Sequence, residues 1–180
     1  MVYVLLAEGF EEIEALAPVD LMRRAGLDVV TVAVGDGKAV VGAHGITVTA
    51  DALIGEIADA KGAELIMLPG GMPGTRNLDA SPSVHALLDE AERGGVRVAA
   101  ICAAPMILGK RGALRGKSAV CYPGFEQYLD GAEISDLKVV TDGKITTGKG
   151  AGAAVEFGLE LVALLCGKET ADGIKNGIFA

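Results

Sequence analysis

Stretches of continuous apolar residues alternate along the chain with segments in which apolar residues recur at helical spacing. The apolar stretches lie at residues 2–7, 28–34, 65–69 and 96–101. Helical patterns separate them at residues 11–25 and 82–94. Because polar residues do not alternate with apolar ones in these stretches, they are typical of strands buried on both faces of a sheet. The pattern predicts an α/β fold in three layers, with helices on both faces of a mostly parallel sheet.

Residues that favour helix termini and tight turns lie at the expected boundaries. Gly26 follows the first helical pattern as a C′ glycine, and the second pattern begins with Ser81 as N-cap and Pro82 in its first turn. Two β-branched runs around GAHG predict a small β-hairpin within residues 39–51. Near the end of the chain, residues 142–143 (Asp-Gly) are typical of a second hairpin turn.

The remaining segments predict three more elements. A helical pattern resumes at residues 53–60, a strand is expected near 118–121, and a long apolar helix is expected from about Gly152 to Cys166. No linker, repeat or low-complexity tract interrupts the pattern. We therefore expect residues 1–180 to form a single domain.

Composition and charge narrow the classes of partner. Of the 180 residues, 51% are hydrophobic, as in a soluble globular protein, and the formal net charge is −8. Because the chain has no cluster of Lys and Arg, we expect it to bind neither nucleic acid nor anionic membrane surfaces. The apolar opening segment is too short to span a bilayer and lacks a basic region before it. We therefore expect no membrane association.

Three cysteines, Cys102, Cys121 and Cys166, occur without the spacing of metal ligands. Their odd number favours neither a disulfide framework nor a zinc site, and it fits a reducing cytoplasm. Cys121 lies at a strand end, and Cys166 closes a Leu-rich helix, so we assign both to packing.

Cys102 differs because it directly follows the strand at residues 96–101 and precedes a short helix. A nucleophile at such a strand-to-helix turn is lifted above the sheet, and the N–H groups of a helix N-terminus favour the thiolate. Small neighbours, among them Ala103, leave room for a substrate. The alternative is a cysteine that serves only as a small buried hydrophobe.

Two further loops are candidates for the same site, because ligands bind beyond the carboxyl ends of parallel strands. The sequence LPGGMPG follows the strand at 65–69, and backbone N–H groups at Gly70 and Gly71 could stabilise an oxyanion. Alone, it would be explained as a tight turn. In the acidic stretch after the first strand, Glu14 shares a helical stripe with apolar residues and faces inward. Desolvation would raise its pKa and suit it to general acid/base work.

Two other sequence features are weaker indications of function. Residues 148–153 (GKGAGA) match a dinucleotide-binding pattern but come too near the C-terminus for the rest of such a fold, so we interpret them as a close strand-to-helix turn. His44 lies in the small hairpin and His85 on a helix face. Neither has a metal-ligand or Cys-His spacing, which favours a solvated or packing role for each.

Four motifs in order, EGFEEIEALAPVDLMRRAG, LPGGMPGTRNL, AAICAAPMIL and TTGKGAGAAVEFGLELV, give the chain a resemblance over nearly its whole length to the ThiJ/PfpI superfamily. The resemblance is to the branch that holds the parkinsonism-associated DJ-one protein and the glutathione-independent glyoxalases. It implies a flavodoxin-like α/β sandwich and a homodimer. It also implies a reactive, easily oxidised cysteine at Cys102, a carboxyl bonded to it at Glu14, and an anion pocket at Gly70, Gly71 and Ala103.

Two positions depart from the family pattern. Many members carry a histidine where this chain has Tyr122, and the members most like it carry an arginine where it has Lys149. Tyrosine is a poor base at neutral pH, which disfavours a Cys-His peptidase mechanism, and lysine keeps the positive charge but not the planar fork of arginine. Together with His44, these two residues are candidates for the pocket.

The resemblance and the residues together predict an enzyme that acts on small reactive aldehydes such as methylglyoxal, or on their glycated adducts, without metal, glutathione or other cofactor. Cys102 would form a hemithioacetal, and Glu14 would move its proton. The alternative from another class is a sensor of oxidative stress or a redox-regulated chaperone, in which Cys102 is oxidised to a sulfinate.

Overall fold

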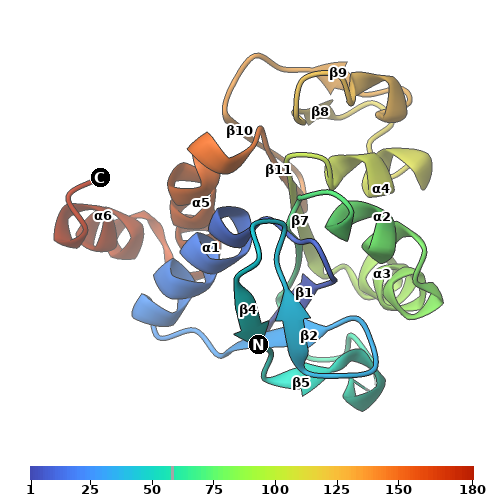
Figure 1. Ribbon diagram of the computed structural model, residues 1–180. Coiled ribbons are helices and arrows are strands. Elements are labelled where there is room, and N and C mark those ends of the chain that lie inside the picture. The colour runs from blue at the N-terminus through green and yellow to red at the C-terminus, as the bar shows by residue number, and fades with distance from the viewer. Residues whose placement is uncertain (58) are drawn as a thin grey trace.

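A computed structural model describes residues 1–57 and 59–180, and its centre is a seven-stranded sheet (Figure 1). In order across the sheet the strands are β10 (Val139–Asp142), β11 (Ile145–Gly148), β7 (Arg97–Ile101), β6 (Leu65–Leu68), β1 (Val2–Leu6), β2 (Val29–Ala33) and β5 (Ala52–Leu53). Only the pairing of β10 with β11 is antiparallel, and the other five pairings in this sheet are parallel. The predicted mostly parallel sheet is confirmed.

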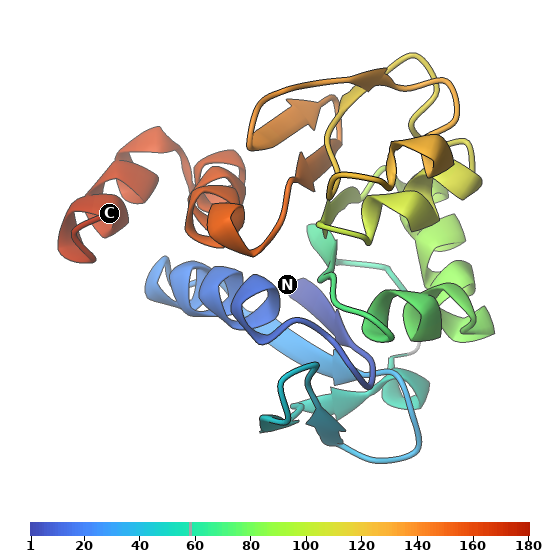
Figure 2. The same ribbon diagram turned by 45° about the horizontal axis from the view of Figure 1, so that its top comes forward.

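Helices cover both faces of this sheet. One face carries α1 (Glu12–Arg24) and α5 (Ala154–Cys166), with α6 (Lys168–Gly177) packed on α5, and the other carries α2 (Gly74–Asp79), α3 (Pro82–Gly94) and α4 (Pro105–Lys110) (Figure 2). Each face of the sheet forms a hydrophobic core with its helices, and alternate residues of β1 point into the two cores. Val4 packs with the α1 and α5 side chains, whereas Leu5 packs in the core on the opposite face. This is the expected three-layer, flavodoxin-like sandwich.

The predicted boundaries agree with the structure at several points. The Ser81 hydroxyl accepts a hydrogen bond from the Val84 N–H at 3.4 Å, and Gly26 follows α1 with a φ of +78°. The small hairpin is present as antiparallel β3 (Ala39–Val41) and β4 (Thr47–Thr49). The second hairpin, β10–β11, turns at Asp142-Gly143 as expected.

Three expectations need correction. The helix expected at 53–60 is absent from the described residues 53–57 and 59–60, and residue 58 lies outside the description. Ala52 and Leu53 pair with β2 as a short edge strand, and the 3₁₀ turn η1 (Ile54–Glu56) follows. The strand near 118–121 is only β8 (Ser118–Ala119), which pairs in parallel with β9 (Glu133–Ile134) and not with the main sheet.

The apolar helix at the end of the chain begins later than expected. The 3₁₀ turn η3 (Ala151–Ala153) precedes α5, and a further 3₁₀ turn, η2 (Glu126–Tyr128), lies after β8. In the described part of the chain, no helix combines the length and the apolar character that a membrane span needs.

Candidate active site

The strand order places three loops at one point of the sheet. β1 is followed along the chain by β2 on one side and, later, by β6 on the other, so the direction of winding reverses between β1 and β6. Loops that leave the carboxyl ends of strands at such a point commonly form ligand sites. Here the loop after β1 binds the loop after β6 through the Glu11 N–H, which donates to the Gly70 carbonyl at 2.9 Å.

Cys102 follows β7 in a strained backbone conformation. Its φ is +65°, and Phe179 is the only other non-glycine residue in the described part of the chain with a positive φ. Such a conformation costs on the order of 1–3 kcal/mol and persists only where the surroundings fix it. Here two backbone hydrogen bonds of 2.8 Å do so, because the Cys102 N–H donates to the Gly148 carbonyl and the Cys102 carbonyl accepts from the Tyr122 N–H. The predicted turn before α4 is confirmed.

Glu14 faces inward from α1, as expected. Its side chain is buried, one carboxylate oxygen accepts the Gly70 N–H at 3.0 Å, and the carboxylate accepts a hydrogen bond from the Cys102 thiol. Burial raises the pKa of Glu14 to about 7, with a further rise from the charge of Glu11, while the bonds from Cys102 and Gly70 act in the opposite direction. A carboxyl with this pKa exchanges protons readily at neutral pH.

The sequence-based expectation of a readily ionised thiol is not met. Burial, followed by the charge and hydrogen bond of Glu14, raises the pKa of Cys102 to about 12, and the N–H groups of Ala103 and Gly71 lower it only in part. Burial and the Glu14 carboxylate together therefore outweigh the stabilisation of the thiolate by these two N–H groups. Since the two groups share a hydrogen bond, they titrate as a pair, and the pair holds one proton between about pH 7 and about pH 12.

The anion pocket differs from the expected one at Gly70. The Gly70 N–H is occupied by Glu14, whereas the N–H groups of Gly71 and Ala103 face the Cys102 sulfur. A Cβ at Gly70 would overlap Glu14 and the Cys102 side chain, and Gly71 has a φ of +92°. Gly70 thus positions the carboxyl, and Gly71 and Ala103 are the N–H groups that point at the sulfur.

Tyr122 lies at the mouth of the site, and Lys149 affects the thiol of Cys121. The exposed Tyr122 ring and the Glu14 carboxyl border the same space, because a Cβ built on Gly150 would lie 3.4 Å from the ring and 3.9 Å from the carboxylate oxygen. The half-buried Lys149 acts on Cys121, where its charge lowers a thiol pKa that burial and Glu126 raise to about 11.

His44 contacts two acidic residues, Glu11 and Glu12, at the edge of the site. Its Nδ1 lies 2.9 Å from the buried Glu12 carboxylate and 3.5 Å from that of Glu11, and both acids raise the pKa of His44. Glu12 also accepts the backbone N–H of His44 at 2.8 Å and of Ile46 at 3.4 Å. Burial raises the pKa of Glu12, but the hydrogen bonds from the His44 ring and from these backbone groups outweigh it and lower the pKa to about 2. The sequence gives no local signal for this role of Glu12, which connects α1 to the hairpin.

The other histidine and cysteines lie outside this site. His85 bonds the Asp79 carbonyl at 2.7 Å and lies 3.0 Å from Arg111, which fits the packing role expected for it. Cys121 is buried in one core, and Cys166 packs against the other.

Comparisons with known proteins agree over nearly the whole chain. The sequence model of the DJ-1/PfpI family matches residues 1–164. Protein dj-1beta of Drosophila melanogaster is 36% identical over 177 residues, which cover 97% of this chain and 94% of the relative. The glutathione-independent glyoxalase DJR-1.2 of Caenorhabditis elegans is 30% identical, with 93% of this chain and 89% of the relative covered.

A solved structure shares the fold. Oxidized DJ-1 of Toxoplasma gondii superposes with a TM-score of 0.94 at 36% sequence identity, and the match covers 99% of this chain and 97% of that one.

Proposed function

Because the chain belongs to the DJ-1/PfpI family, we propose that it converts 2-oxoaldehydes such as methylglyoxal to 2-hydroxy acids in a cysteine-dependent reaction that uses no glutathione. The observation that carries this proposal is the buried Glu14–Cys102 pair, which shares one proton beneath the N–H groups of Gly71 and Ala103. A family relative with this activity, the C. elegans glyoxalase, supports it.

In the first step Glu14 takes the thiol proton of Cys102 as the sulfur attacks the aldehyde carbon. The product is a hemithioacetal, and the N–H groups of Gly71 and Ala103 stabilise the oxygen that becomes negative during the attack. A proton returned from Glu14 leaves this oxygen as a hydroxyl group.

In the second step Glu14 removes the proton from the former aldehyde carbon, and the former ketone oxygen gains a proton, which gives an enediol. Glu14 returns its proton to the neighbouring carbon, and the hydroxyl group on the former aldehyde carbon loses its proton, so that in total one proton moves from carbon to carbon and one from oxygen to oxygen. The former aldehyde carbon is thereby oxidised to a thioester, while the ketone carbon is reduced to an alcohol, so no external electron carrier is needed. Water then hydrolyses the thioester to the 2-hydroxy acid and restores the thiol. The same addition to glycated amines or thiols would appear as deglycase activity. As proposed, the reaction uses neither metal nor cofactor.

The direct test is lactate formation from methylglyoxal by the purified protein without glutathione or added metal. Lactate that accumulates in proportion to protein concentration and time supports the enzyme. If no lactate forms above the uncatalysed rate, the glyoxalase proposal is wrong.

A second candidate is a peroxide sensor, favoured by the same Gly71 and Ala103 N–H groups, which could stabilise a Cys102 sulfinate. The Toxoplasma relative was solved in an oxidized form. Mass spectrometry after peroxide treatment would show two added oxygen atoms on the Cys102 peptide. Because this readout is independent of turnover, the two functions can be tested separately.

The pH dependence of kcat/KM tests whether Glu14 and Cys102 share one proton in the reactive form. The reactive form carries an ionised Glu14 and a protonated Cys102, so kcat/KM is expected to rise as pH increases through about 7, where Glu14 loses its proton. The rate should then stay level through pH 9, because the pKa of Cys102 lies near 12. Initial rates of lactate formation from pH 5 to 9 check this. A rate that falls across this range would contradict the assigned roles.

We also propose that the chain forms the homodimer that the family resemblance implies and that it is located in the cytoplasm. Three exposed apolar residues, Ile13, Ile46 and Met72, lie on segments that contact one another near the site. We expect Ile13→Glu to convert a dimer to a monomer in light scattering, since a charge in the centre of an apolar interface is unfavourable. Leu137→Glu, at another exposed apolar residue, is the control. A wild-type monomer would contradict the proposal.

A further inference from the structure

The proposed reaction determines where the variable part of a 2-oxoaldehyde lies. Its aldehyde carbon is bonded to the Cys102 sulfur, and Glu14 carries a proton from that carbon to the ketone carbon. The ketone carbon therefore lies beside the Glu14 carboxylate, and the substituent bonded to it, which is a methyl group in methylglyoxal, occupies the space next to this carboxylate. The side chains that border this space decide which 2-oxoaldehydes are favoured.

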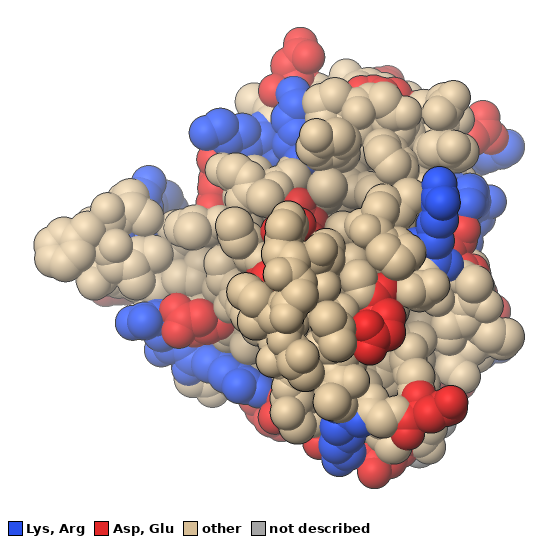
Figure 3. Space-filling view, viewed as in Figure 1, with Lys and Arg blue, Asp and Glu red and all other residues tan. Residues whose placement is uncertain are grey.

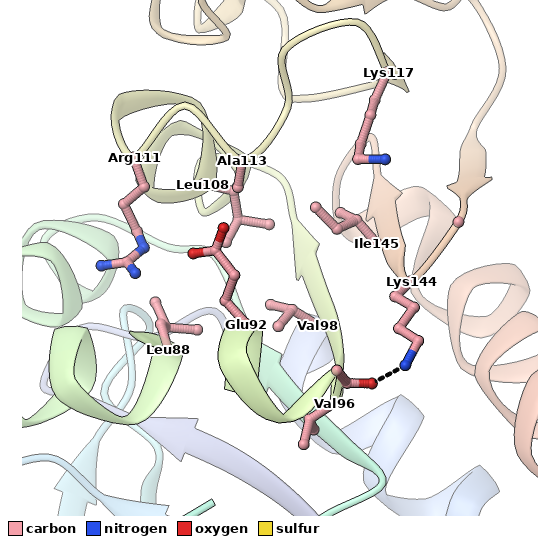
Figure 4. A pocket seen from close by; sticks show the side chains of 12 residues that line it. Leu88, Glu92, Val96, Val98, Leu108, Arg111, Ala113, Lys117, Lys144 and Ile145 are labelled. Atoms are coloured by element: carbon pink, nitrogen blue, oxygen red, sulfur yellow. Dashed lines mark hydrogen bonds between the residues drawn. The ribbon is translucent and has the colours of Figure 1, made fainter. Parts of the chain in front are cut away.

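The substituent does not reach the cavity shown in Figure 4. That cavity, of about 390 Å³, lies between α3 and the amino-terminal ends of β7 and β11 (Figure 4). Cys102 follows the carboxyl end of β7, and the five residues of this strand separate Cys102 from the cavity by about 15 Å at about 3.3 Å per residue. The substituent is therefore accommodated within the site itself.

The ring of Tyr122 borders the space beside the Glu14 carboxylate. One carboxylate oxygen, Oε2, accepts the Gly70 N–H at 3.0 Å. The other oxygen, Oε1, lies 3.9 Å from the point where a Cβ on Gly150 would stand, and Cδ2 of the Tyr122 ring lies 3.4 Å from the same point. Because both distances are ordinary van der Waals contacts, the space admits a carbon atom between the ring and the carboxylate.

Two contacts hold Tyr122 in this position. Its backbone N–H donates to the Cys102 carbonyl at 2.8 Å, which links it directly to the residue that carries the nucleophile. Its ring packs edge to face with Phe125, with the ring centroids 6.4 Å apart and an angle of 78° between the ring planes. Tyr122 is still 51% exposed, so about half of its surface is free to contact a substrate.

The charges around the site disfavour an anionic substituent. Glu11 lies close enough to Glu14 for its charge to raise the pKa of that carboxyl. In the view of Figures 1 and 3, Lys and Arg side chains lie near the rim of the molecule, while uncharged and acidic residues cover its centre, where the β3–β4 hairpin lies beside α1. These carboxylates would repel an anionic group, whereas an uncharged one would not be repelled.

On the basis of the proposed reaction, we propose that Tyr122 favours 2-oxoaldehydes whose ketone carbon carries an aromatic ring, and that this ring packs against the Tyr122 side chain beside Glu14. Two aromatic rings in contact gain more than the area that they bury, and a methyl group covers little of the ring. The chemistry is unchanged: phenylglyoxal and one water molecule give mandelate, with the aldehyde carbon oxidised and the ketone carbon reduced.

The test compares kcat/KM for mandelate formation from phenylglyoxal with kcat/KM for lactate formation from methylglyoxal. Tyr122→Ala should lower the ratio of the first constant to the second by about three- to tenfold, as expected for the loss of one aromatic contact. The intrinsic reactivities of the two compounds cancel when this ratio is compared between variants. Tyr122→Phe keeps the ring and should keep the ratio.

Tyr128→Ala is the matched control. Its ring is 38% exposed and also pairs with Phe125, with the ring centroids 5.8 Å apart, so the variant removes a similar aromatic group from the same segment. The ratio should not change in this variant. An unchanged ratio in Tyr122→Ala, with lactate formation intact, would overturn the role of Tyr122 and leave the proposed reaction standing. If the wild type forms neither lactate nor mandelate, the proposed reaction is wrong and the role of Tyr122 in it is wrong as well.

Gly150→Ala supplies an independent measurement. The φ of Gly150 is 161°, an extended conformation that any residue adopts, and the added methyl group would make ordinary contacts with Tyr122 and Glu14, so the fold should be kept. Because this methyl group occupies the place proposed for the aromatic ring, the phenylglyoxal-to-methylglyoxal ratio should fall by at least about threefold. An unchanged ratio would mean that the aromatic ring does not lie between Tyr122 and Glu14, which would overturn the proposal.

Discussion

Cys102→Ser is expected to lower kcat/KM for lactate formation from methylglyoxal by at least about 10³-fold. A serine hydroxyl is a far weaker acid than a thiol, so a Glu14 carboxylate with a pKa of about 7 cannot remove its proton to a useful extent. Serine also forms an ester in place of a thioester, which slows the final hydrolysis. Initial rates of lactate formation for the wild type and the variant measure this loss.

The chain contains its own controls for this experiment. Cys121→Ser and Cys166→Ser remove the other two thiols, which pack against the cores away from Glu14, and should keep more than about half of the activity. If Cys102→Ser were as active as these variants, Cys102 would not be the nucleophile. If the wild type itself formed no lactate, oxidation of Cys102 would become the leading function.

The layers of the fold could be predicted because each buried strand has a continuous apolar pattern. β1 and β6 face helices on both sides, so both sets of alternating side chains are apolar and the pattern is unambiguous. The hairpins could be predicted for a similar local reason, since β-branched residues flank short glycine-containing turns. In these elements local preference and tertiary packing agree.

Elements that depend on distant partners could not be predicted in this way. The segment after Asp51 has a helical pattern, but the Asp51 carboxylate accepts the Thr31 N–H at 2.8 Å and holds the segment against β2 as an edge strand. The helix α6 was missed because it contains two glycines and Ala171 is its only buried residue, which leaves little apolar pattern to detect.

In the candidate active site too, features set by local sequence could be predicted and features set by distant contacts could not. The positions of Cys102 and Glu14 follow from a strand end and a helical stripe, both of which are local features. Contacts between distant segments determine the partner of the Gly70 N–H, the burial of Glu12 and the effect of Lys149 on Cys121. Spacing in the sequence contains no signal for such contacts. The raised pKa of Cys102 was missed for the same reason, since it comes from burial of the thiol by distant segments and from the carboxylate of Glu14 beside the sulfur.

Glu14→Gln is expected to lower kcat/KM by about 10²–10⁴-fold. The amide can still accept the Gly70 N–H, but it cannot take the thiol proton of Cys102 or move a proton between the two carbon atoms of the hemithioacetal. The inflection near pH 7 should disappear from whatever activity remains, which separates loss of an acid/base group from a change of shape. An inflection that persisted in Glu14→Gln would assign the titration to another group.

The same substitution should change stability in the opposite direction at high pH. The pKa of Glu14 rises from its ordinary value of 4.5 to about 7 on folding, so the folded state keeps a proton that the unfolded chain has lost. The stabilisation from this proton is complete below pH 4.5 and is lost as pH rises through 7; at 1.36 kcal/mol per pKa unit it amounts to up to about 3 kcal/mol.

A glutamine cannot ionise, so Glu14→Gln should avoid that loss. Urea unfolding at pH 4.5 and pH 8.5 should therefore show the variant gaining on the wild type by up to about 3 kcal/mol between the two pH values. A difference that stays constant with pH would mean that Glu14 is ionised throughout and is no acid/base group near neutrality. If Glu14→Gln gains stability at high pH and loses activity, the ionised Glu14 carboxylate is unfavourable for folding. The protein then keeps this buried charge at the position where the proposed reaction needs a base.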